Sequence, residues 1–358
     1  MLIVRSPMRI SLGGGGTDLE AYYSRYGGVV VSTSIDKYFY VLINPADSRM
    51  LQVISADYQS LFRSPITQGF DGKSPLALPE AIFQHFRVEG GLQAFLASEV
   101  PPGTGLGSSS AAAVAIIHAL STWLKQPLEK DQLAELAASI EISRLGLPIG
   151  KQDHYASAFG GLNMLTFSND GVEVVPLQID PEIKLTLEKR LMLFSTGLSH
   201  ASASILVKQR KSTQYQNPDI LGFLHNIKQA ALDMKRCLER GDLDEFARLL
   251  DYSWQEKRLL APGITNHFID RAFVVAGFNG AKAGKITGAG GGGFLLLYCP
   301  ERAQAAVTAV LEERGLKRLL FQFEQAGASV VFQSAHEDEH ASPGPGDVSF
   351  LRAFSSHP

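Results

Sequence analysis

The first half of the chain alternates between short strand-like runs and longer apolar helical runs. β-Branched and aromatic residues gather in stretches that are typical of strands. Residues 111–124 form an apolar run with the length and density of a buried helix, and Gly146 and Pro148 end the helix predicted to start at Pro127. Strands are predicted over 2–4, 10–12, 29–34, 38–43, 92–98 and 162–167, a helix over 79–86, hairpins and loops over 46–75, and a hairpin turn at 169–171.

The second half begins near residue 180 and is richer in helices. An apolar stretch at 185–194 predicts a strand, and the glycine-rich segment 285–294 leads into another apolar strand. Strands and helices follow one another without regular strand–helix–strand units, which favours an α+β architecture over a doubly wound sheet. Helices are predicted over about 199–213, 220–239, 242–251, 266–276 and 301–314, and a last strand over 328–333.

The length of the chain and the change in its element content predict two domains. A chain of 358 residues is longer than most single domains. We expect an N-terminal domain over 1–178 and a C-terminal domain over 179–334. The remaining residues, 335–358, are rich in His, Ser, Pro, Gly and acidic residues and predict a loose tail, which Phe350, Leu351 and Phe354 could dock.

The composition is that of an ordinary soluble globular protein. Hydrophobic residues make up 45% and charged residues 19% of the chain, and the formal net charge is −3. A nucleic-acid-binding protein usually carries a clear positive excess, so this balance argues against a nucleic acid as partner. The two cysteines are far apart, which excludes a disulfide framework and a cysteine-based zinc site and fits a reducing, cytoplasmic setting.

The apolar runs are too short for a membrane protein. At the N-terminus the run 2–4 is interrupted by Arg5 and Pro7, whereas a secretory signal needs about 7–15 apolar residues in succession. The apolar run 111–124 is shorter than the roughly 20 residues that span a bilayer. We therefore expect a cytoplasmic protein without a membrane partner.

The segment 101–111, Pro-Pro-Gly-Thr-Gly-Leu-Gly-Ser-Ser-Ser-Ala, has the features of a phosphate-binding loop. Glycines let backbone N–H groups approach an anion closely, and the serines stand where a helix begins, so free N–H groups and a partial positive charge favour phosphate there. Serine hydroxyls at this place can also bind Mg²⁺. The alternative is a flexible loop with a serine cap, which the density of Gly and Ser between a strand and a long apolar helix disfavours.

Two familiar nucleotide-binding motifs do not fit the chain. A Walker A loop requires Gly-Lys-Ser/Thr, but this loop has no lysine, and Gly284-Lys285 is followed by Ile286. The dinucleotide pattern Gly-x-Gly-x-x-Gly occurs at 288–293, but it precedes a strand where that motif requires a helix. The loop 101–111 is therefore a third kind of phosphate site.

Three motifs together resemble the GHMP kinase superfamily, which includes galactokinase, homoserine kinase, mevalonate kinase and phosphomevalonate kinase. The second motif of that superfamily, Pro-x3-Gly-Leu-Gly/Ala-Ser-Ser-Ser/Ala-Ala, stands complete at 101–111. The first stands at 7–18, as Pro-Met-Arg-Ile-Ser-Leu followed by four glycines and Thr-Asp, and the third is the glycine-rich segment 285–294. The resemblance implies a two-domain α+β fold, with an N-terminal half like domain 2 of ribosomal protein S5 and a ferredoxin-like C-terminal half.

Within the superfamily, the chain is similar to the bacterial D-glycero-D-manno-heptose 7-phosphate 1-kinases at 14–18, 32–38, 150–155 and 195–199. Those enzymes use ATP to make a heptose 1,7-bisphosphate, on the way to GDP-heptose for surface polysaccharides. The chain departs from them at His200, where the subgroup has arginine. Two alternatives remain open: another sugar 1-kinase, for fucose, galactose or mannose, and a non-catalytic sensor that binds sugar and ATP.

The resemblance also implies roles for individual residues. Asp153 would be the base that takes the proton of the acceptor hydroxyl, and Arg9 would hold it in place. Lys151, two positions before Asp153, would lower the pKa of that carboxyl and neutralise the transferring phosphoryl group. Mg²⁺ would be held by Glu141 and a serine, for which we take Ser108. ATP would bind to Pro101, Gly103, Gly105, Leu106, Gly107, Ser108, Ser109 and Ser110.

The acceptor is expected between Asp18, Asp153 and the glycine-rich turn 288–293. A carboxylate such as Asp18 can accept hydrogen bonds from two vicinal hydroxyls, which suits a sugar, although an aspartate after glycines can also simply cap a turn. The second phosphate of a sugar phosphate needs a cation, and the sequence does not choose among Lys37, Lys208, Arg210 and Lys211. The expected partners are ATP and a sugar phosphate, with a homodimer left open. The predicted acceptor residues are Gly15, Gly16, Thr17, Asp18, Asp153, Gly288, Gly290 and Gly291.

Overall fold

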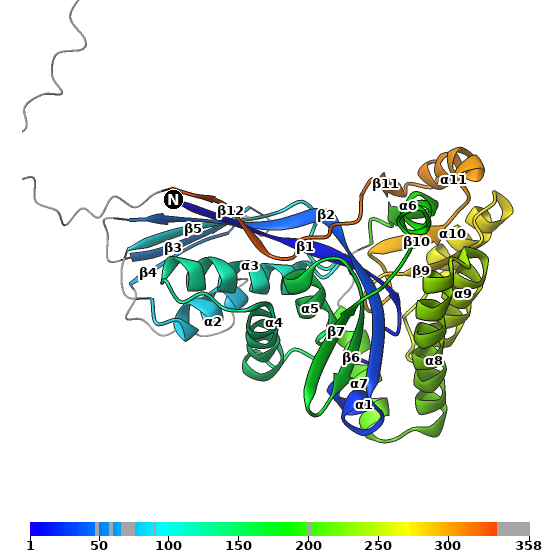
Figure 1. The fold of residues 1–358 in the computed structure, drawn as a ribbon, viewed down its shortest axis with the longest axis horizontal. Helices are drawn as coiled ribbons and strands as arrows, with labels where there is room; N and C mark the ends of the chain where they lie inside the picture. Colours follow the sequence, from blue (N-terminus) through cyan, green and yellow to red (C-terminus); the bar gives the residue numbers. More distant parts are fainter. Residues whose placement is uncertain (47–49, 57–59, 66–75, 89–90, 199–201, 335–358) are drawn as a thin grey trace, which may run out of the picture.

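The structure is a computed structural model that describes residues 1–46, 50–56, 60–65, 76–88, 91–198 and 202–334. It is elongated, with a large sheet and its covering helices at one end and a smaller unit of helices and strands at the other (Figure 1). Two sheets mixed with helices confirm the predicted α+β architecture. The predicted tail 335–358, with Phe350, Leu351 and Phe354, lies outside the described residues.

The larger sheet has eight strands, most of them from the N-terminal half. Its main path runs in the order β12-β1-β2-β5-β3-β4, and β6 pairs with both β2 and β7. The bounds are β1 Leu2–Gly13, β2 Gly28–Pro45, β3 Met50–Ser55, β4 Ser60–Pro65, β5 Leu92–Ser98, β6 Leu162–Ser168, β7 Gly171–Pro176 and β12 Ser329–Gln333.

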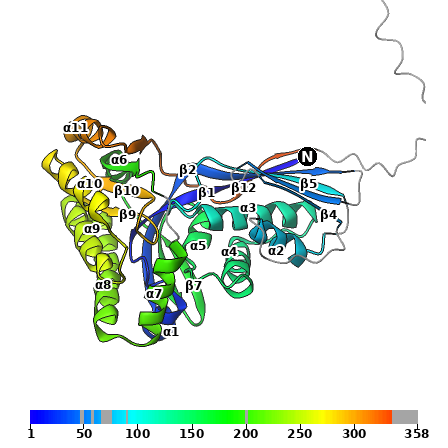
Figure 2. The ribbon, with the colours of Figure 1, turned by 180° about the vertical axis from the view of Figure 1, so that it is seen from behind.

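One face of this sheet carries the helices that hold much of the site. Helix α3 contacts both β1 and β2, and its alanines from Ala111 to Ala115 are buried, because small side chains let the helix lie close to the strands. Helices α2, α4 and α5 lie on the same side (Figure 2). The bounds are α1 Glu20–Tyr26, α2 Ala77–His85, α3 Ser108–Trp123, α4 Lys130–Ala138, a π-helical turn Ser139–Arg144, and α5 Gln152–Phe159.

The smaller unit has a four-stranded antiparallel sheet in the order β11-β8-β10-β9. Helices α8 and α9 pack side by side; α9 contacts β9 of this sheet, and α8 contacts β1 and β2 of the larger sheet (Figure 1). The bounds are α6 Pro181–Arg190, β8 Leu191–Ser195, α7 Ser202–Gln214, α8 Pro218–Arg240, α9 Leu243–Arg258, α10 His267–Phe278, β9 Ala283–Ile286, β10 Phe294–Tyr298, α11 Glu301–Glu312 and β11 Lys317–Leu319.

Two pairs of predicted strands are in fact two long strands. The runs 2–4 and 10–12 both belong to β1, and the runs 29–34 and 38–43 both belong to β2. Pro7 does not end β1, because it lies beyond the residues that pair with β12 and directly before a register shift in the pairing with β2. The missing N–H of proline is tolerated at such an irregular position. Arg9 therefore lies on a continuous strand, in which it pairs with Ser34 of β2.

The predicted strand at 185–194 was wrong over most of its length. Residues up to Arg190 form helix α6, and only β8 after it is extended. Pro181 occupies the first turn of the helix, and the Asp180 side chain caps it by accepting a hydrogen bond from the Glu182 N–H at 2.8 Å. Lys189 in the last turn also suits the helix dipole. These start and stop signals outweigh the apolar content of the segment.

The two halves are not independent along the chain. The last strand, β12, was predicted within a C-terminal domain 179–334, but it pairs antiparallel with β1 in the larger sheet. Buried residues of both halves also form one continuous core, which joins Leu193 and Met234 to Ile10. The boundary near 178 stays a prediction, with the correction that residues 329–333 return to the N-terminal sheet.

Most of the other predicted elements are present, whereas helices α1 and α5 and strands β9 and β11 were not predicted. The hairpin β6–β7 turns at the predicted 169–171, and β3–β4 form a hairpin within 46–75. The predicted helices of the second half correspond to α7, α8, α9, α10 and α11. None of the helices in the described residues is both long and apolar enough to cross a bilayer.

Candidate active site

Two glycine-rich segments from opposite halves of the chain pack directly against each other. The loop 101–111, called the Gly/Ser loop from here on, leads from β5 into α3, and the turn 287–293 joins β9 to β10. A Cβ atom at Gly105 would lie 2.6 Å from the carbonyl oxygen of Thr287, and one at Gly288 would lie 2.5 Å from the Cα of Gly105. Both glycines have positive φ angles, of 81° and 66°. Any other residue would be strained and would separate the segments.

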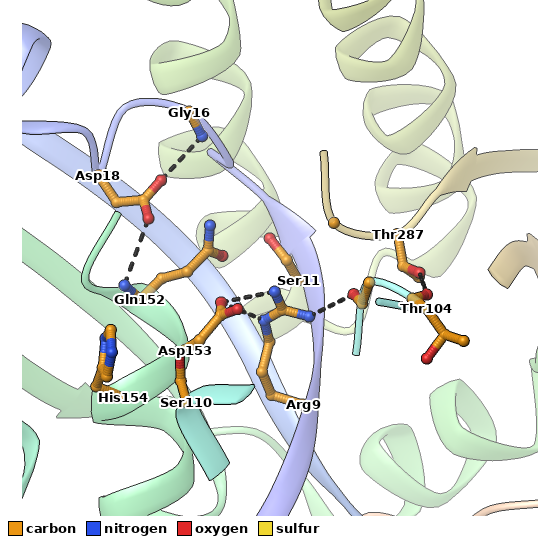
Figure 3. A network of polar contacts seen from close by, with 12 residues as sticks. Arg9, Ser11, Gly16, Asp18, Thr104, Ser110, Gln152, Asp153, His154 and Thr287 are labelled. Carbon is orange, nitrogen blue, oxygen red and sulfur yellow. Dashed lines mark hydrogen bonds and ion pairs between the residues drawn. The ribbon is translucent and has the colours of Figure 1, made fainter. Parts of the chain in front are cut away.

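Arg9 on β1 links the Gly/Ser loop to Asp153 on α5 (Figure 3). Its Nε and Nη2 lie 2.7 Å and 2.6 Å from Oδ1 of Asp153. Its Nη1 donates to the carbonyl oxygen of Gly105 at 2.8 Å, and its backbone N–H donates to that of Leu106 at 3.0 Å. The Arg9 side chain is 3% exposed and that of Asp153 is 23% exposed. The buried Arg9 thus fixes the carboxylate of Asp153, which stays partly accessible to solvent.

The second carboxylate oxygen of Asp153 faces the Gly/Ser loop. A Cβ atom at Gly107 would lie 3.3 Å from Oδ2 of Asp153. Gly107 is the N-cap of α3, where it has a φ angle of 76°, and no side chain caps this helix end. The N-terminus of a long helix with free N–H groups favours an anion. The uncapped N-terminus of α3 and a carboxylate oxygen therefore lie next to each other.

Asp18 follows the run of four glycines at 13–16, the first glycine-rich segment of the chain, and is almost completely buried. The N–H of Gly16 donates to its Oδ1 at 2.9 Å, and the N–H of Gln152 lies 3.4 Å from its Oδ2 (Figure 3). A Cβ atom at Gly150 would lie 1.9 Å from Oδ2, so only glycine fits there. Burial is the main cause that raises the pKa of the Asp18 carboxyl, against the hydrogen bond from Gly16, and the charge of Asp153 adds to it.

Two buried lysines of the smaller unit reach into the same region. Lys257 on α9 donates to the carbonyl oxygen of Gly288 at 2.5 Å, and Lys285 on β9 donates to that of Ser11 at 2.9 Å. Burial lowers the pKa of Lys257 to about 8, although the charge of Asp18 opposes this. Burial also lowers the pKa of Lys285 well below its ordinary value. The acidic groups of the larger unit thus face basic groups from the smaller one.

Glu141 forms a second polar centre behind the Gly/Ser loop. It lies in the π-helical turn and is fully buried. The hydroxyl of Ser109 donates to Oε1, while Oε2 accepts from the hydroxyl of Ser110 at 2.9 Å and contacts Nε2 of His154 at 2.7 Å. Burial alone would raise the pKa of Glu141, but the hydrogen bond and charge of His154, with the two serines, hold it below its ordinary value. Glu141 is therefore an ionised carboxylate beside the loop.

The structure gives three predicted site residues different partners. Lys151 forms an ion pair with Glu135 at 2.6 Å, and the cation that contacts Asp153 among the described residues is Arg9. The hydroxyls that reach Glu141 are those of Ser109 and Ser110, where the sequence suggested Ser108.

The third is Thr17, whose hydroxyl is committed to the fold. It donates to the carbonyl oxygens of Gly14 and Val29 at 2.8 Å and 2.9 Å, and it accepts from the N–H of Val29 at 3.0 Å. The side chain is fully buried. Thr17 therefore holds the first glycine-rich segment against β2, and it is a supporting residue where an acceptor contact was expected.

The other predicted residues lie at the site or just behind it. Gly291 donates its N–H to the carbonyl oxygen of Ile264 at 2.7 Å, and a Cβ at Gly290 would lie 2.7 Å from the same oxygen, so both pack against the segment between α9 and α10. Leu106 is fully buried. Of the candidates for a distal phosphate, Lys37 contacts Asp36 at 3.3 Å. Lys208, Arg210 and Lys211 lie on α7, and Ser199 and His200 lie outside the described residues.

Sequence reasoning missed several polar residues of this region. Lys257 had a signal, because it continues the buried stripe of Leu243, Leu250 and Trp254 along α9, where an apolar residue is expected. The others had none: Ser11 and Gln209 are ordinary polar residues until the fold buries them, and of Gln152 the fold buries the side-chain oxygen. His154 lies in a resembling motif, but its contact with Glu141 needed the structure.

The lowered pKa of Lys257 predicts a specific pH dependence of stability. Between pH 8 and pH 10.5 the unfolded chain, with the ordinary lysine pKa, binds more protons at this site than the folded chain does. The free energy of unfolding should therefore rise with pH in this window. The charged groups that face Lys257 are the same in the wild type and in a variant that changes only Lys257, so a comparison of the two isolates the lysine. These groups are Asp18, Asp153, Arg9 and Lys285.

Chemical denaturation of the wild type and of Lys257→Met at pH 7 and pH 10 measures this effect. The wild type should gain on the order of 2 kcal/mol relative to the variant over that interval, since one pKa unit corresponds to about 1.4 kcal/mol. Lys317→Met, at an exposed position, is the matched control. Equal pH dependence in the wild type and Lys257→Met would show that Lys257 is not a buried cation.

Comparison with known proteins identifies a family whose profiles match both halves of the chain. The profile of the GHMP kinase N-terminal domain matches residues 76–161, which include the Gly/Ser loop and Asp153. The profile of the GHMP kinase C-terminal domain matches residues 234–316, which include Lys257 and the turn 287–293.

Alignments with individual relatives cover most of the chain. The D-glycero-alpha-D-manno-heptose 7-phosphate kinase of Campylobacter jejuni is 33% identical over 318 residues, which cover 87% of this chain and 93% of that protein. The crystal structure of a D-glycero-D-manno-heptose 1-phosphate kinase from Bacteroides thetaiotaomicron is 30% identical, with a TM-score of 0.77, and the match covers 94% of this chain and 100% of that one. The L-fucokinase/L-fucose-1-P guanylyltransferase of Bacteroides fragilis is 26% identical over 85% of this chain and 35% of its own length. The chain belongs to the GHMP kinases, and it is an ATP-dependent sugar kinase.

Proposed function

We propose that the protein transfers the γ-phosphoryl group of ATP to the anomeric hydroxyl of D-glycero-D-manno-heptose 7-phosphate and gives the 1,7-bisphosphate. The observation that carries this proposal is the Asp153 carboxylate, which Arg9 holds beside the N-terminus of α3. The near full-length similarity to the heptose 7-phosphate kinase of Campylobacter jejuni supports the choice of acceptor. The product suits a route to GDP-heptose and surface polysaccharide, in a cytoplasmic setting that two buried free cysteines support.

The Gly/Ser loop is the proposed site of the ATP phosphates. Its glycines at 103, 105 and 107 have positive φ angles, and the uncapped start of α3 follows them. Beside Ser108 and Ser109 a pocket opens that suits the flat, apolar faces of a nucleobase. Its apolar lining includes Phe39, Leu76, Leu78, Pro79, Leu96 and Pro102.

Asp153 is the proposed base. Arg9 binds Oδ1 with two nitrogens, whereas Oδ2 lies beside Gly107 at the edge of the phosphate site. An acceptor hydroxyl that hydrogen-bonds to Oδ2 would point its oxygen at the γ-phosphate. An anomeric hydroxyl is more acidic than an ordinary alcohol, so a carboxylate is a strong enough base to take its proton. Arg9 holds this carboxylate in position, and positioning is most of what phosphoryl transfer requires of a protein.

Glu141 and the serines at the start of α3 fit a Mg²⁺ ion that accompanies ATP. Carboxylate and hydroxyl oxygens are the hard ligands that Mg²⁺ prefers. Ser109 and Ser110 each donate their proton to Glu141, so the lone pairs of the hydroxyl oxygens remain available. Bound there, the ion would neutralise charge on the phosphates. His154 contacts the same carboxylate and fixes its orientation.

The choice of acceptor is tested with a panel of sugars. Purified protein with ATP and Mg²⁺ should phosphorylate heptose 7-phosphate with a kcat/KM well above that for L-fucose, D-galactose or D-mannose, and the product should carry its new phosphate on the anomeric carbon. ADP release and phosphorus NMR of the product measure both points. The similarity to a fucokinase makes L-fucose the strongest competitor. If free hexoses react faster by orders of magnitude, the assignment of the heptose phosphate is wrong.

The metal site is tested by single serine substitutions. Ser109→Ala and Ser110→Ala should raise the Mg²⁺ concentration needed for half-maximal ATP binding by about tenfold, because each removes an oxygen that Glu141 orients. Ser108→Ala is the matched control and should have a much smaller effect. Calorimetric titration of ATP at a series of Mg²⁺ concentrations measures this. If Ser108→Ala has the largest effect, the original prediction of Ser108 is right and the assignment to its neighbours is not.

A further inference from the structure

The face of the larger sheet that points away from α3 carries a row of apolar side chains. Successive residues of a strand point to opposite faces of a sheet, so on β1, β2, β5 and β3 these side chains alternate with buried ones. Ile3, for example, lies between Leu2 and Val4, which are 1% and 0% exposed and belong to the larger hydrophobic core. The apolar row consists of one residue each from β12, β1, β2, β5 and β3, namely Phe332, Ile3, Leu42, Phe95 and Ile54.

The register of the sheet places these residues opposite one another. Ile3 pairs with Phe332 on one side and with Leu42 on the other. Phe95 continues the row, because it pairs with both Leu42 and Ile54. Paired residues of neighbouring strands share a face of the sheet. Four strand spacings of about 4.8 Å make the row about 19 Å long, so it forms one continuous apolar stripe.

The apolar row lies outside both hydrophobic cores of the described residues. Phe95 is 37% exposed and Phe332 is 44% exposed. In Figure 1, α2 and α3 lie below this part of the sheet, and no helix of the described residues lies above it. A sheet face in contact with water normally carries polar residues, so an apolar row on this face indicates a binding surface.

Polar side chains border the apolar row along its length. Two residues away from the row on one side, Gln93 of β5 pairs with both Asn44 of β2 and Gln52 of β3, and its side chain donates to Oε1 of Gln52 at 3.1 Å. Two residues away on the other side, Arg5 of β1 pairs with Tyr40 of β2. An apolar patch with a polar rim is typical of an interaction site. The surface therefore fits a short apolar segment of chain.

The part of the chain that follows β12 starts at one end of the apolar row. β12 carries Phe332, and directly after this strand the N–H of Ser334 donates to the carbonyl oxygen of Met1 at 2.9 Å. The sequence continues over 335–358, and its large apolar residues stand together in 347–354, Asp-Val-Ser-Phe-Leu-Arg-Ala-Phe. The residues before them, 335–346, include no large apolar side chain. A short apolar segment is thus attached to the edge of the surface.

The length of the connection suits the length of the apolar row. Residues 335–347 separate Ser334 from Val348 and include the sequence Pro-Gly-Pro-Gly at 343–346. Thirteen residues reach at most about 45 Å when fully extended, and a linker of this length without regular structure has an r.m.s. end-to-end distance of about 20 Å. The whole row of about 19 Å is therefore within reach of the apolar segment.

We propose that residues 347–354 dock on the apolar row of the larger sheet and cover it. Val348, Phe350, Leu351 and Phe354 supply the apolar contacts. The attachment to β12 makes this binding intramolecular, with an effective concentration on the order of millimolar when the linker matches the span. This concentration favours the chain's own segment over a second copy of the protein. The apolar row contains none of the residues assigned to the candidate active site.

Limited proteolysis with chymotrypsin tests the docking, because this protease cleaves after Phe and Leu. Cleavage within 347–354 should be slow in the wild type and about tenfold faster or more in Phe95→Gln, since the rate follows the population of the undocked segment. Phe95→Gln interrupts the row at an exposed position outside both cores. Leu185→Gln on α6, at an apolar residue that is 49% exposed, is the matched control and should cleave like the wild type.

A deletion provides a second, independent measurement. A chain that ends at Ser334 should bind a hydrophobic dye such as ANS several-fold more strongly than the full chain, because the apolar row is then uncovered. The same deletion in the Phe95→Gln variant should raise dye binding much less. Circular dichroism establishes that each variant is folded, and mass spectrometry of the fragments identifies the bonds that chymotrypsin cleaves.

The outcomes separate the proposed segment from other occupants. Equal cleavage of 347–354 in the folded wild type and the folded Phe95→Gln variant would overturn the proposal. A wild type that sediments as a dimer, and that Phe95→Gln converts to a monomer without a change in cleavage, would assign the row to a second copy and also overturn it. Faster cleavage in Phe95→Gln alone supports the docking. None of these measurements uses kinase activity, so their failure leaves the proposed function intact.

Discussion

The ion pair between Arg9 and Asp153 is the interaction on which the rest of the site depends. Arg9 is almost fully buried, and it joins three elements: two of its nitrogens contact the Asp153 carboxylate, a third contacts Gly105, and its backbone N–H donates to Leu106. A buried charge that loses its partner costs about 3–5 kcal/mol, so β1, α5 and the Gly/Ser loop are held in one relative position. That position leaves Oδ2 of Asp153 beside Gly107, where a base for phosphoryl transfer is needed.

The smaller unit completes the site by direct backbone contact and by charge. Gly288 meets Gly105 so closely that neither tolerates a side chain, and Lys257 and Lys285 extend from the smaller unit towards the first glycine segment. The strand β12 pairs with the start of β1, so the end of the described chain returns to the larger sheet. Catalysis therefore requires the two units to be docked, and their common core provides for this.

The residues with a local signature were predictable from sequence, and those defined by distant contacts were not. The loop 101–111, Arg9 and Asp153 stand in compact motifs, and the structure brings them together as expected. The role of Lys151 was inferred from its distance along the chain to Asp153, but on the helix start its side chain turns to Glu135. Ser108 could not be told from its neighbours, because the direction of each hydroxyl depends on the exact start of α3. The sequence prediction divided β1 into two strands around Pro7. The proline is tolerated because the pairing with β2 is irregular at that point, and this irregularity is visible only once the partner strand is known.

The most direct test of this account is the turnover of Asp153→Ala with ATP, Mg²⁺ and heptose 7-phosphate. Loss of a general base lowers kcat by about 10²–10⁴-fold. The affinity for ATP should remain unchanged, because Arg9 keeps its own contacts with Gly105 and Leu106 of the Gly/Ser loop. Lys151→Met, which breaks only the contact with Glu135, should keep a kcat close to that of the wild type. An Asp153→Ala enzyme that releases ADP at the wild-type rate would contradict the central claim that this carboxylate is the base.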